Sequence, residues 1–298
     1  MWQYNWFVHR LIISTIVVFF SAGITYAEVG TGLLWRVHKP QHPVNYLFGT
    51  IHVDDKRVKT LNSNIKRRFD EAKTLCLEVL PDRETQVGIG LAMLLPEQES
   101  LDEILGESLF NRLSLAMNRL GITPLETIRL KPWAAMIVLG RPESNGGYAL
   151  DEQLYHWGNH QYKNLCALET LKEQLSIFDQ LSHVDQKSLL IDTLDNLSEL
   201  KELNETLILA YLSGNLDEIY HQSLEMEGGN TELARRLREQ LIDKRNERMA
   251  ERLVATLDKG NAFIAVGALH LPGEKGLLQL LRNKGFIVTP PSIPVSPW

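Results

Sequence analysis

Two stretches of this sequence decide its fold: residues 46–52 are YLFGTIH and residues 263–270 are FIAVGALH. Each is an apolar run followed by Gly-x-x-His, and such a run is typical of a strand buried on both faces of a sheet. Ligands of α/β proteins bind where the carboxyl ends of such strands meet. The glycine lets backbone or ligand approach closely and permits a positive φ. We therefore predict His52 and His270 at the functional edge of the sheet; the alternative is that each caps its strand through a hydrogen bond.

The rest of the chain places strands at both ends and helices between them. Apolar positions recur with a period of about 3.6 residues between 171 and 257, and residues 101–120 are predicted to form one helix that ends at Gly121. We expect an α/β fold, with a central mixed sheet built from the N- and C-terminal strands and a helical insertion at about 83–260, in one domain covering 28–298. Strands are predicted at 33–37, 44–51, 75–80, 163–168, 261–266 and 285–289.

Composition excludes several classes of protein. The 298 residues are 44% hydrophobic and 23% charged, which is ordinary for a globular chain and excludes a disordered or collagen-like one. The net charge is −6, so the chain lacks the excess of positive charge that is typical of nucleic-acid binders, and we expect no nucleic-acid partner. Only the N-terminus is apolar enough to meet a membrane, which excludes a multi-span membrane protein.

The first 27 residues have the order of a secretory signal peptide. Arg10 precedes an apolar run at 11–20, and Thr25-Tyr26-Ala27 offers small groups before Glu28. We predict cleavage before Glu28. The alternative is an uncleaved N-terminal anchor, which would be the only contact with a membrane.

Two cysteines, Cys76 and Cys166, both lie in predicted strands. An exported chain can pair them, but a bridge needs Cα atoms within about 7 Å of each other. Buried free thiols are the simpler expectation, because free cysteine packs as a small apolar residue.

One carboxylate lies inside an apolar strand, where burial without a partner is costly. Glu78 is flanked by Cys76-Leu77 and Val79-Leu80, so it needs an arginine, backbone donors or a metal. Two histidines and one carboxylate suit a catalytic divalent metal. Glu169, at another strand end, is a candidate ligand, general base or helix N-cap, although Thr170 competes for the cap.

Two other pairs of residues are candidates for the site, but each also has a purely structural interpretation. His156 and His160 have the i, i+4 spacing of a zinc pair, but the glutamate of His-Glu-x-x-His is missing and Gly158 interrupts the helix. Arg245 and Asn246 lie in a charged helix, whose default is a solvated face. The functional alternative is an arginine that reaches an acid or a substrate carbonyl.

These motifs, taken together, resemble the TraB/GumN family, which is related to the Tiki metalloproteases. The resemblance covers about residues 33–289 and is carried by motifs in a specific order. They are Leu34-Trp35-Arg36-Val37, residues 46–52, Leu77-Glu78-Val79, Lys131-Pro132-Trp133, the helix at Asp151, Leu168-Glu169-Thr170 with Gln174, Arg245-Asn246, and residues 266–273.

The resemblance implies a Tiki-like fold akin to the erythromycin-esterase and ChaN group. It also implies a metal site made by His52, His270 and Glu78, with manganese or cobalt favoured and zinc as a further candidate. The bacterial exported branch that the chain resembles implies a periplasmic or cell-envelope location. The catalytic candidates are Glu78, Glu169, Arg245 and Asn246.

The leading hypothesis is therefore a metal-dependent hydrolase, in particular a peptidase, that acts on a peptide or protein outside the cytoplasm. Its metal would polarise the scissile carbonyl and activate a water. The alternative is an envelope protein that binds peptides or sequesters a pheromone in the same pocket without turnover.

Overall fold

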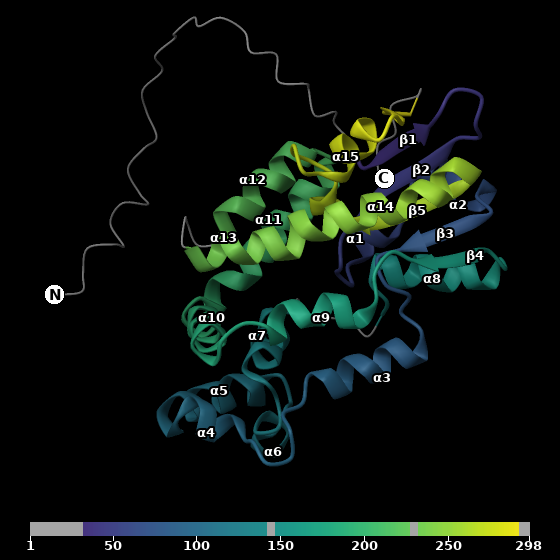
Figure 1. Cartoon of the computed structure of the whole chain (residues 1–298). Helices are drawn as coiled ribbons and strands as arrows, with labels where there is room; N and C mark the ends of the chain where they lie inside the picture. Colours follow the sequence, from purple (N-terminus) through teal and green to yellow (C-terminus); the bar gives the residue numbers. More distant parts are fainter. Residues whose placement is uncertain (1–31, 142–146, 227–231, 292–298) are drawn as a thin grey trace, which may run out of the picture.

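A six-stranded mixed sheet forms the centre of the molecule. The computed structural model describes residues 32–141, 147–226 and 232–291, and the predicted signal peptide lies outside them (Figure 1). The strand order is β4-β3-β5-β2-β1-β6, so the expected mixed sheet and the α/β class are confirmed. The strands are β1 (Leu34–His38), β2 (Asn45–Thr50), β3 (Thr74–Leu77), β4 (Asn164–Ala167), β5 (Ala262–Gly267) and β6 (Ile287–Thr289).

Four neighbouring strands of this sheet are parallel. β2 and β3 both pair in parallel with β5, and β4 pairs in parallel with β3, whereas β1 is antiparallel to both β2 and β6. Thr50 lies opposite Gly267, and Leu77 lies opposite Ala265. The carboxyl ends of β3, β5 and β2 therefore meet at one edge of the sheet, as the two Gly-x-x-His motifs require.

Helices cover the sheet and make up most of the chain between β3 and β5 (Figure 1). Five successive residues of β5 are buried, which shows that both faces of the sheet are covered there. The helices are α1 (Lys56–Lys59), α2 (Ser63–Glu71), α3 (Arg83–Ala92), α4 (Leu101–Leu105), α5 (Glu107–Arg119), α6 (Pro124–Thr127), α7 (Pro132–Gly140), α8 (Leu150–His160), α9 (Leu171–Asp179), α10 (His183–Asp195), α11 (Leu197–Ser213), α12 (Leu216–Met226), α13 (Glu232–Arg238), the π-helical segment η2 (Glu239–Asp243), α14 (Lys244–Lys259), the 3₁₀ turn η3 (Ala268–His270) and α15 (Leu277–Asn283).

A second, smaller hydrophobic cluster lies away from the sheet, where α4, α5, α7 and α10 pack together. The helix predicted at 101–120 is in fact two helices, α4 and α5. Gly106 separates them because its φ of 81° leaves the helical region. The division into domains stays a prediction.

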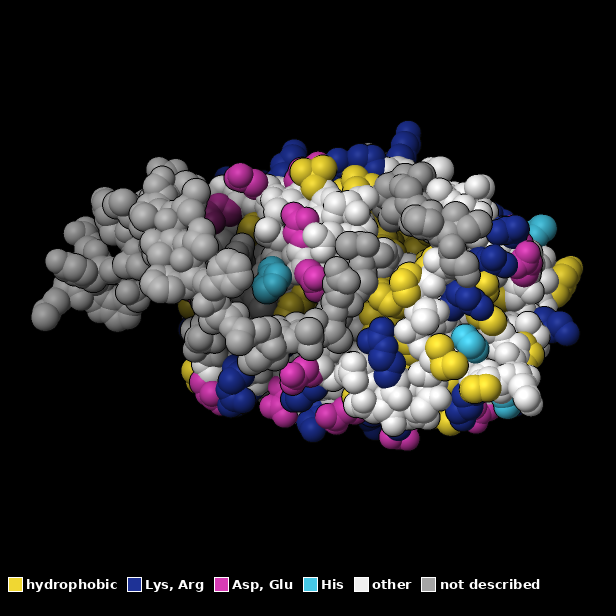
Figure 2. Space-filling model, turned by 90° about the horizontal axis from the view of Figure 1, so that it is seen from above, with side chains coloured by type: hydrophobic (Ala, Val, Ile, Leu, Met, Phe, Trp, Pro, Cys, Tyr) yellow, Lys and Arg dark blue, Asp and Glu magenta, His cyan; other side chains and the backbone are white. Residues whose placement is uncertain are grey.

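The surface carries charges of both signs. Viewed from above, basic and acidic side chains occur on the same face together with scattered hydrophobic ones (Figure 2). Among the described residues, no helix combines the length and the apolar character needed to cross a membrane.

The two cysteines form a disulfide, so the expectation of free thiols is wrong. Cys76 and Cys166 lie directly opposite each other on the parallel strands β3 and β4, with Cα atoms 4.6 Å apart. Sequence could not give this pairing, because it depends on which strands are neighbours and on their register. The bond closes a loop whose ends are 90 residues apart in sequence.

Removing the disulfide should destabilise the protein. Because the bond restricts the unfolded chain, replacing both cysteines (Cys76→Ala with Cys166→Ala) should lower the free energy of unfolding by about 2–5 kcal/mol in denaturant titrations. In the unmodified protein, alkylation under denaturing conditions should add no label before reduction and one label per cysteine afterwards. Labelling of both thiols without reduction would contradict the pairing.

Candidate active site

Three strand ends bring together two histidines and a glutamate. Glu78 directly follows β3, His52 lies two residues after β2, and His270 ends the turn η3 that follows β5. Nε2 of His52 and Nε2 of His270 are each 3.8 Å from the same atom, Oε1 of Glu78. The structure thus places all three predicted metal ligands around one point. His52 is open to solvent, with 57% of its side chain exposed, whereas His270 is 5% exposed.

Glycine is needed at this point for space. The Gly267 N–H donates a hydrogen bond to Oε1 of Glu78 (2.6 Å). A Cβ on Gly267 would lie 3.3 Å from that oxygen and 3.5 Å from Nε2 of His52. On Gly49 it would lie 3.1 Å from the Cα of Ala268. Neither glycine has a positive φ, so left-handed backbone does not explain them. Close approach to the backbone of Ala268 explains Gly49, whereas a Cβ on Gly267 would meet only the ends of two side chains.

The Nδ1 atom of each histidine ring lies within hydrogen-bond distance of a polar side chain. Nδ1 of His52 is 2.9 Å from Oδ1 of Asp151, at the start of α8. Nδ1 of His270 is 2.7 Å from Oδ1 of Asn246, on α14. The Asn246 amide also donates to the carbonyl of Lys275 (2.8 Å), which fixes its oxygen toward the histidine. With the proton on Nδ1, the His270 ring can direct its Nε2 lone pair at the shared point, as metal-binding histidines do. His52 can do the same only when its ring is neutral.

The charge states follow from these contacts. Desolvation would lower the pKa of the His52 ring, but the hydrogen bond and charge of Asp151, with Glu78, raise it. Burial lowers the pKa of His270 to about 4 against the attraction of Glu78. Burial would raise the pKa of Glu78, but His270, Arg245, His52 and the Gly267 N–H together hold it at about 2. At neutral pH Glu78 is therefore ionised and His270 neutral.

A buried network of ion pairs lies behind Glu78. Arg245 pairs with Oε2 of Glu78 through Nη2 and with Oε2 of Glu169 through Nε (2.8 Å). Arg248 binds the other oxygen of Glu169 at 2.9 Å, and the Glu169 side chain has no exposed surface. Gln174 lies within 3.4 Å of both carboxylates. The default interpretation of Arg245 as part of a solvated face is wrong, and the arginine reaches two acids.

Glu169 is not a helix cap. Thr170 caps α9 in a capping box. The Thr170 hydroxyl accepts a hydrogen bond from the backbone N–H of Glu173, and the Glu173 carboxylate accepts one from the backbone N–H of Thr170. Glu169 instead orients Arg245. No atom of Glu169 lies on the cavity described below.

Arg245 and Asn246 are neighbours in sequence yet contact different parts of the site. The π-helical segment η2 ends just before them, and Nη1 of Arg245 donates to the carbonyl of Leu241 within it (3.2 Å). Such segments are rare and occur often at functional sites. Apolar periodicity does not reveal a single π-helical turn, so this turn could not be predicted from the sequence.

The site opens into a cavity of about 290 Å³. His52, Glu78 and Asp151 line it, with apolar walls from α3, α9 and the sheet. Thr50 also lines this cavity, and its Oγ1 is buried with no hydrogen-bond partner among the described residues. The wall-forming side chains include Leu77, Ile89, Leu171, Ala265, Thr85 and Gln86.

The side chains are of the types that divalent ions bind, but the structure does not hold them as a metal site. Within residues 32–141, 147–226 and 232–291, no cluster of three or more His, Cys, Asp or Glu side chains is arranged as a ready metal site. Ligands that each lie about 2.1 Å from one tetrahedral ion are about 3.4 Å apart, so both distances of 3.8 Å would have to shorten before the two rings and Glu78 could share an ion. His156, from the rival histidine pair, packs instead against Tyr148, with ring centroids 4.2 Å apart.

Comparison with known proteins identifies the family. The model of the TraB/PrgY/gumN family matches residues 33–290. The chain belongs to this family. No solved structure matches it significantly.

Relatives within the family differ in how much is known of them. The chain is 27% identical over 309 residues to "Metalloprotease TIKI2" of Xenopus tropicalis and 27% identical over 310 residues to "Metalloprotease TIKI1" of Homo sapiens, each time with 86% of the chain aligned. It spans only 59% and 61% of the length of those relatives. It is also 26% identical to "Uncharacterized protein YbaP" of Escherichia coli (strain K12), with 80% of the chain and 87% of that relative aligned.

The buried ion pairs predict a large stability effect at Glu169. Glu169→Gln removes the buried carboxylate that Arg245 and Arg248 share and leaves Arg245 with Glu78 alone, so the free energy of unfolding should fall by about 3–5 kcal/mol. Glu173→Gln is the matched control: its pair with Arg252 is partly exposed, and glutamine can keep the capping box. It should cost less than about 1 kcal/mol. Equal losses in denaturant titrations would contradict the network.

Proposed function

We propose that this chain is a metal-dependent hydrolase of peptides that acts outside the cytoplasm. The observation that carries the proposal is the convergence of two histidine Nε2 atoms on one oxygen of Glu78, beside a cavity that His52 and Glu78 line. The relatives named metalloproteases support the reaction class.

His52, His270 and Glu78 would hold the metal. Imidazole and carboxylate together suit manganese, cobalt and zinc, of which we favour manganese or cobalt. When bound, such an ion would polarise the scissile carbonyl and activate a water molecule. Function does not follow from fold alone, so the proposal depends on this donor set.

The remaining residues of the site would orient the three proposed ligands and shield a bound peptide from water. Asp151 and Asn246 orient the two rings, while Arg245 and the Gly267 N–H keep the Glu78 carboxylate in one place. The apolar walls of the cavity would exclude water from a bound peptide segment and hold its side chain. Of the catalytic candidates, Glu78 faces the cavity, whereas Arg245, Asn246 and Glu169 act through it and through His270.

A second function is favoured by one specific observation. Each oxygen of Glu78 already accepts a hydrogen bond from the protein, one from Arg245 and one from Gly267. A carboxylate fixed in this way can also be a structural ion pair. In that case the same cavity would bind or sequester a peptide without cleaving it.

Histidine variants separate the two functions. His52→Ala and His270→Ala should each abolish metal-dependent cleavage of a peptide library, and chelator should do the same to the unmodified protein. Because metal stabilises the folded state by RT ln(1 + [L]/Kd), each variant should also lose the increase in melting temperature that added manganese or cobalt produces. The matched control is His160→Ala, an exposed position on α8.

The outcomes are distinct. Peptide binding without any metal shift or cleavage would favour the sequestering function. If His52→Ala and His270→Ala kept both the full shift and full cleavage, the assigned site would be wrong, and His156 and His160 would become the next candidates.

The disulfide supports the part of the proposal that concerns location. Disulfides form and persist in oxidising compartments such as the bacterial periplasm, and Cys76 and Cys166 are joined. Together with the signal-like order of residues 1–27, this favours export to the periplasm or cell envelope.

Export makes a prediction about the N-terminus. Protein recovered from an exporting host should begin at or near Glu28, because signal peptidase cuts after small residues such as Ala27. Edman sequencing or intact mass measures this directly. A membrane-bound product that still begins at Met1 or Trp2 would instead support an N-terminal anchor.

A further inference from the structure

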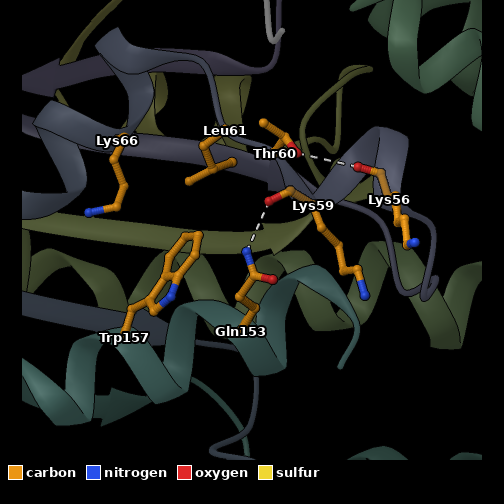
Figure 3. A pocket seen from close by; sticks show the side chains of 7 residues that line it. All are labelled: Lys56, Lys59, Thr60, Leu61, Lys66, Gln153 and Trp157. Carbon is orange, nitrogen blue, oxygen red and sulfur yellow. Dashed lines mark hydrogen bonds between the residues drawn. The ribbon is translucent and has the colours of Figure 1, made fainter. Parts of the chain in front are cut away.

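The cavity beside His52 has an uneven distribution of charge. Three acidic side chains line it, Glu78, Asp151 and Glu152, and none of the described lining residues is a lysine or an arginine. A second cavity, of about 510 Å³ between α1, α2 and α8, has the opposite character, because three lysines of α1 and α2 line it and no acidic residue does (Figure 3). The two cavities share no lining residue, so the acidic lining belongs to the candidate active site alone.

Two of the three acids in the active-site cavity already have a charged partner. Glu78 pairs with Arg245. Oδ1 of Asp151 lies 2.9 Å from Nδ1 of His52. Glu152 makes no ion pair within the described part of the chain, and its one hydrogen bond there comes from a backbone N–H at the start of α8 to Oε2 (3.0 Å). Oε1 of Glu152 is therefore left for a ligand.

A second polar group of the same cavity has no partner. Thr50 ends β2 and is 2% exposed, and its Oγ1 makes no hydrogen bond among the described residues. Buried polar groups almost always have a partner, and water or a ligand supplies one where the protein does not. This unpaired hydroxyl is a separate indication that the cavity takes a ligand with a hydrogen-bonding group.

Apolar walls narrow the class of ligand further. Side chains from β3, α3 and α9 give the cavity an apolar surface, namely Leu77, Ile89 and Leu171. A lysine or arginine side chain matches this combination, because its aliphatic stem packs on apolar surface while its charged end binds a carboxylate. The α-ammonium of a peptide carries the same charge, and the side chain of its first residue would then contact the walls.

We propose that this cavity is a cation-binding subsite, in which Oε1 of Glu152 binds a positively charged group of the peptide substrate. That group is a lysine or arginine side chain or the α-ammonium at the N-terminus. Because His52 and Glu78 line the same cavity, the residue bound there would lie close to the bond to be cleaved. This inference rests on the proposed peptide hydrolase and names the class of peptide that it takes.

The test uses four alanine-rich peptides of one length, each with fluorescein at the C-terminus. Three are acetylated and carry one central lysine, arginine or norleucine, and the fourth carries norleucine and a free N-terminus. Norleucine keeps the aliphatic stem of lysine without its ammonium group. Binding is measured by fluorescence anisotropy with chelator present, so that no turnover is needed. Cleavage is measured separately by mass spectrometry with manganese or cobalt.

We expect a charged peptide to bind about two- to fivefold tighter than the acetylated norleucine peptide, as for one partly exposed ion pair. Tighter binding of the lysine and arginine peptides identifies a side chain as the source of the charge, and tighter binding of the free-amine peptide identifies the N-terminus. Added sodium chloride should reduce the preference, because salt screens the attraction. These comparisons need no variant.

Glu152→Gln should abolish the preference for charge. Glutamine removes the negative charge, but its amide oxygen can still accept from the N–H of Ala149, so the start of α8 is kept. Glu126→Gln is the matched control, because Oε2 of Glu126 accepts from the N–H of Thr123 (2.8 Å) in the same way at the start of α6 without lining the cavity. It should leave the preference unchanged, and melting curves show that both variants are folded.

The results distinguish the subsite from the hydrolase. Equal binding of the four peptides, no binding of any, or a preference that Glu152→Gln leaves intact overturns the subsite, as does an equal loss in the Glu126→Gln control. Cleavage without any preference for charged peptides also overturns the subsite and leaves the hydrolase intact. A preference for charge that Glu152→Gln removes, without cleavage under any metal, supports the subsite and overturns the hydrolase.

Discussion

The ion pair between Glu78 and Arg245 is the interaction on which the rest of the site depends. A buried carboxylate is tolerated only with full partners, and Glu78 has the guanidinium on one oxygen and the Gly267 N–H on the other. Arg245 is itself nearly buried, so its charge needs the second carboxylate, Glu169, which Arg248 shares. Two arginines balance two glutamates only when β3, β5, the start of α9 and α14 are all docked. The helical part of the chain is thereby tied to the carboxyl edge of the sheet.

Polar groups also fix the opposite end of the strand that leads to His52. Asn45 begins β2 and is fully buried, yet its amide is satisfied. It donates to the carbonyls of Val37 (3.1 Å) and Leu257 (2.9 Å) and accepts from the N–H of Ala262 (3.0 Å). One side chain thus joins β1, β2, the end of α14 and the start of β5. Because a slip of one residue would reverse the faces of a strand, this contact helps to set the parallel register that carries His52 and His270 to the same edge.

The residues of the site that end strands could be predicted from the sequence. The contacts that depend on which helices and strands lie side by side were missed. Apolar runs ending in Gly-x-x-His located both histidines, and the isolated acid Glu78 required a partner. The helix at Asp151 was among the motifs, but no role was predicted for Asp151 itself, because an acid in the first turn of a helix is ordinary. Its contact with His52 exists only once α8 lies beside the loop after β2. The disulfide and the break at Gly106 were missed for the same kind of reason: the first needs strand order, and the second needs a φ that leucine spacing does not report.

The position of α8 therefore governs the contact between Asp151 and His52. Gly158 allows the helix to lie close to β3, since a Cβ there would come within 2.6 Å of a methyl group of Leu75. A larger residue at 158 would push the helix away from the sheet, and its first turn would carry Asp151 away from His52. The same shift would move Trp157 and Gln153 relative to the lysines of α1 and α2. The glycine that seemed to interrupt a metal-binding helix is thus the residue that lets this helix lie close to the sheet and orient His52.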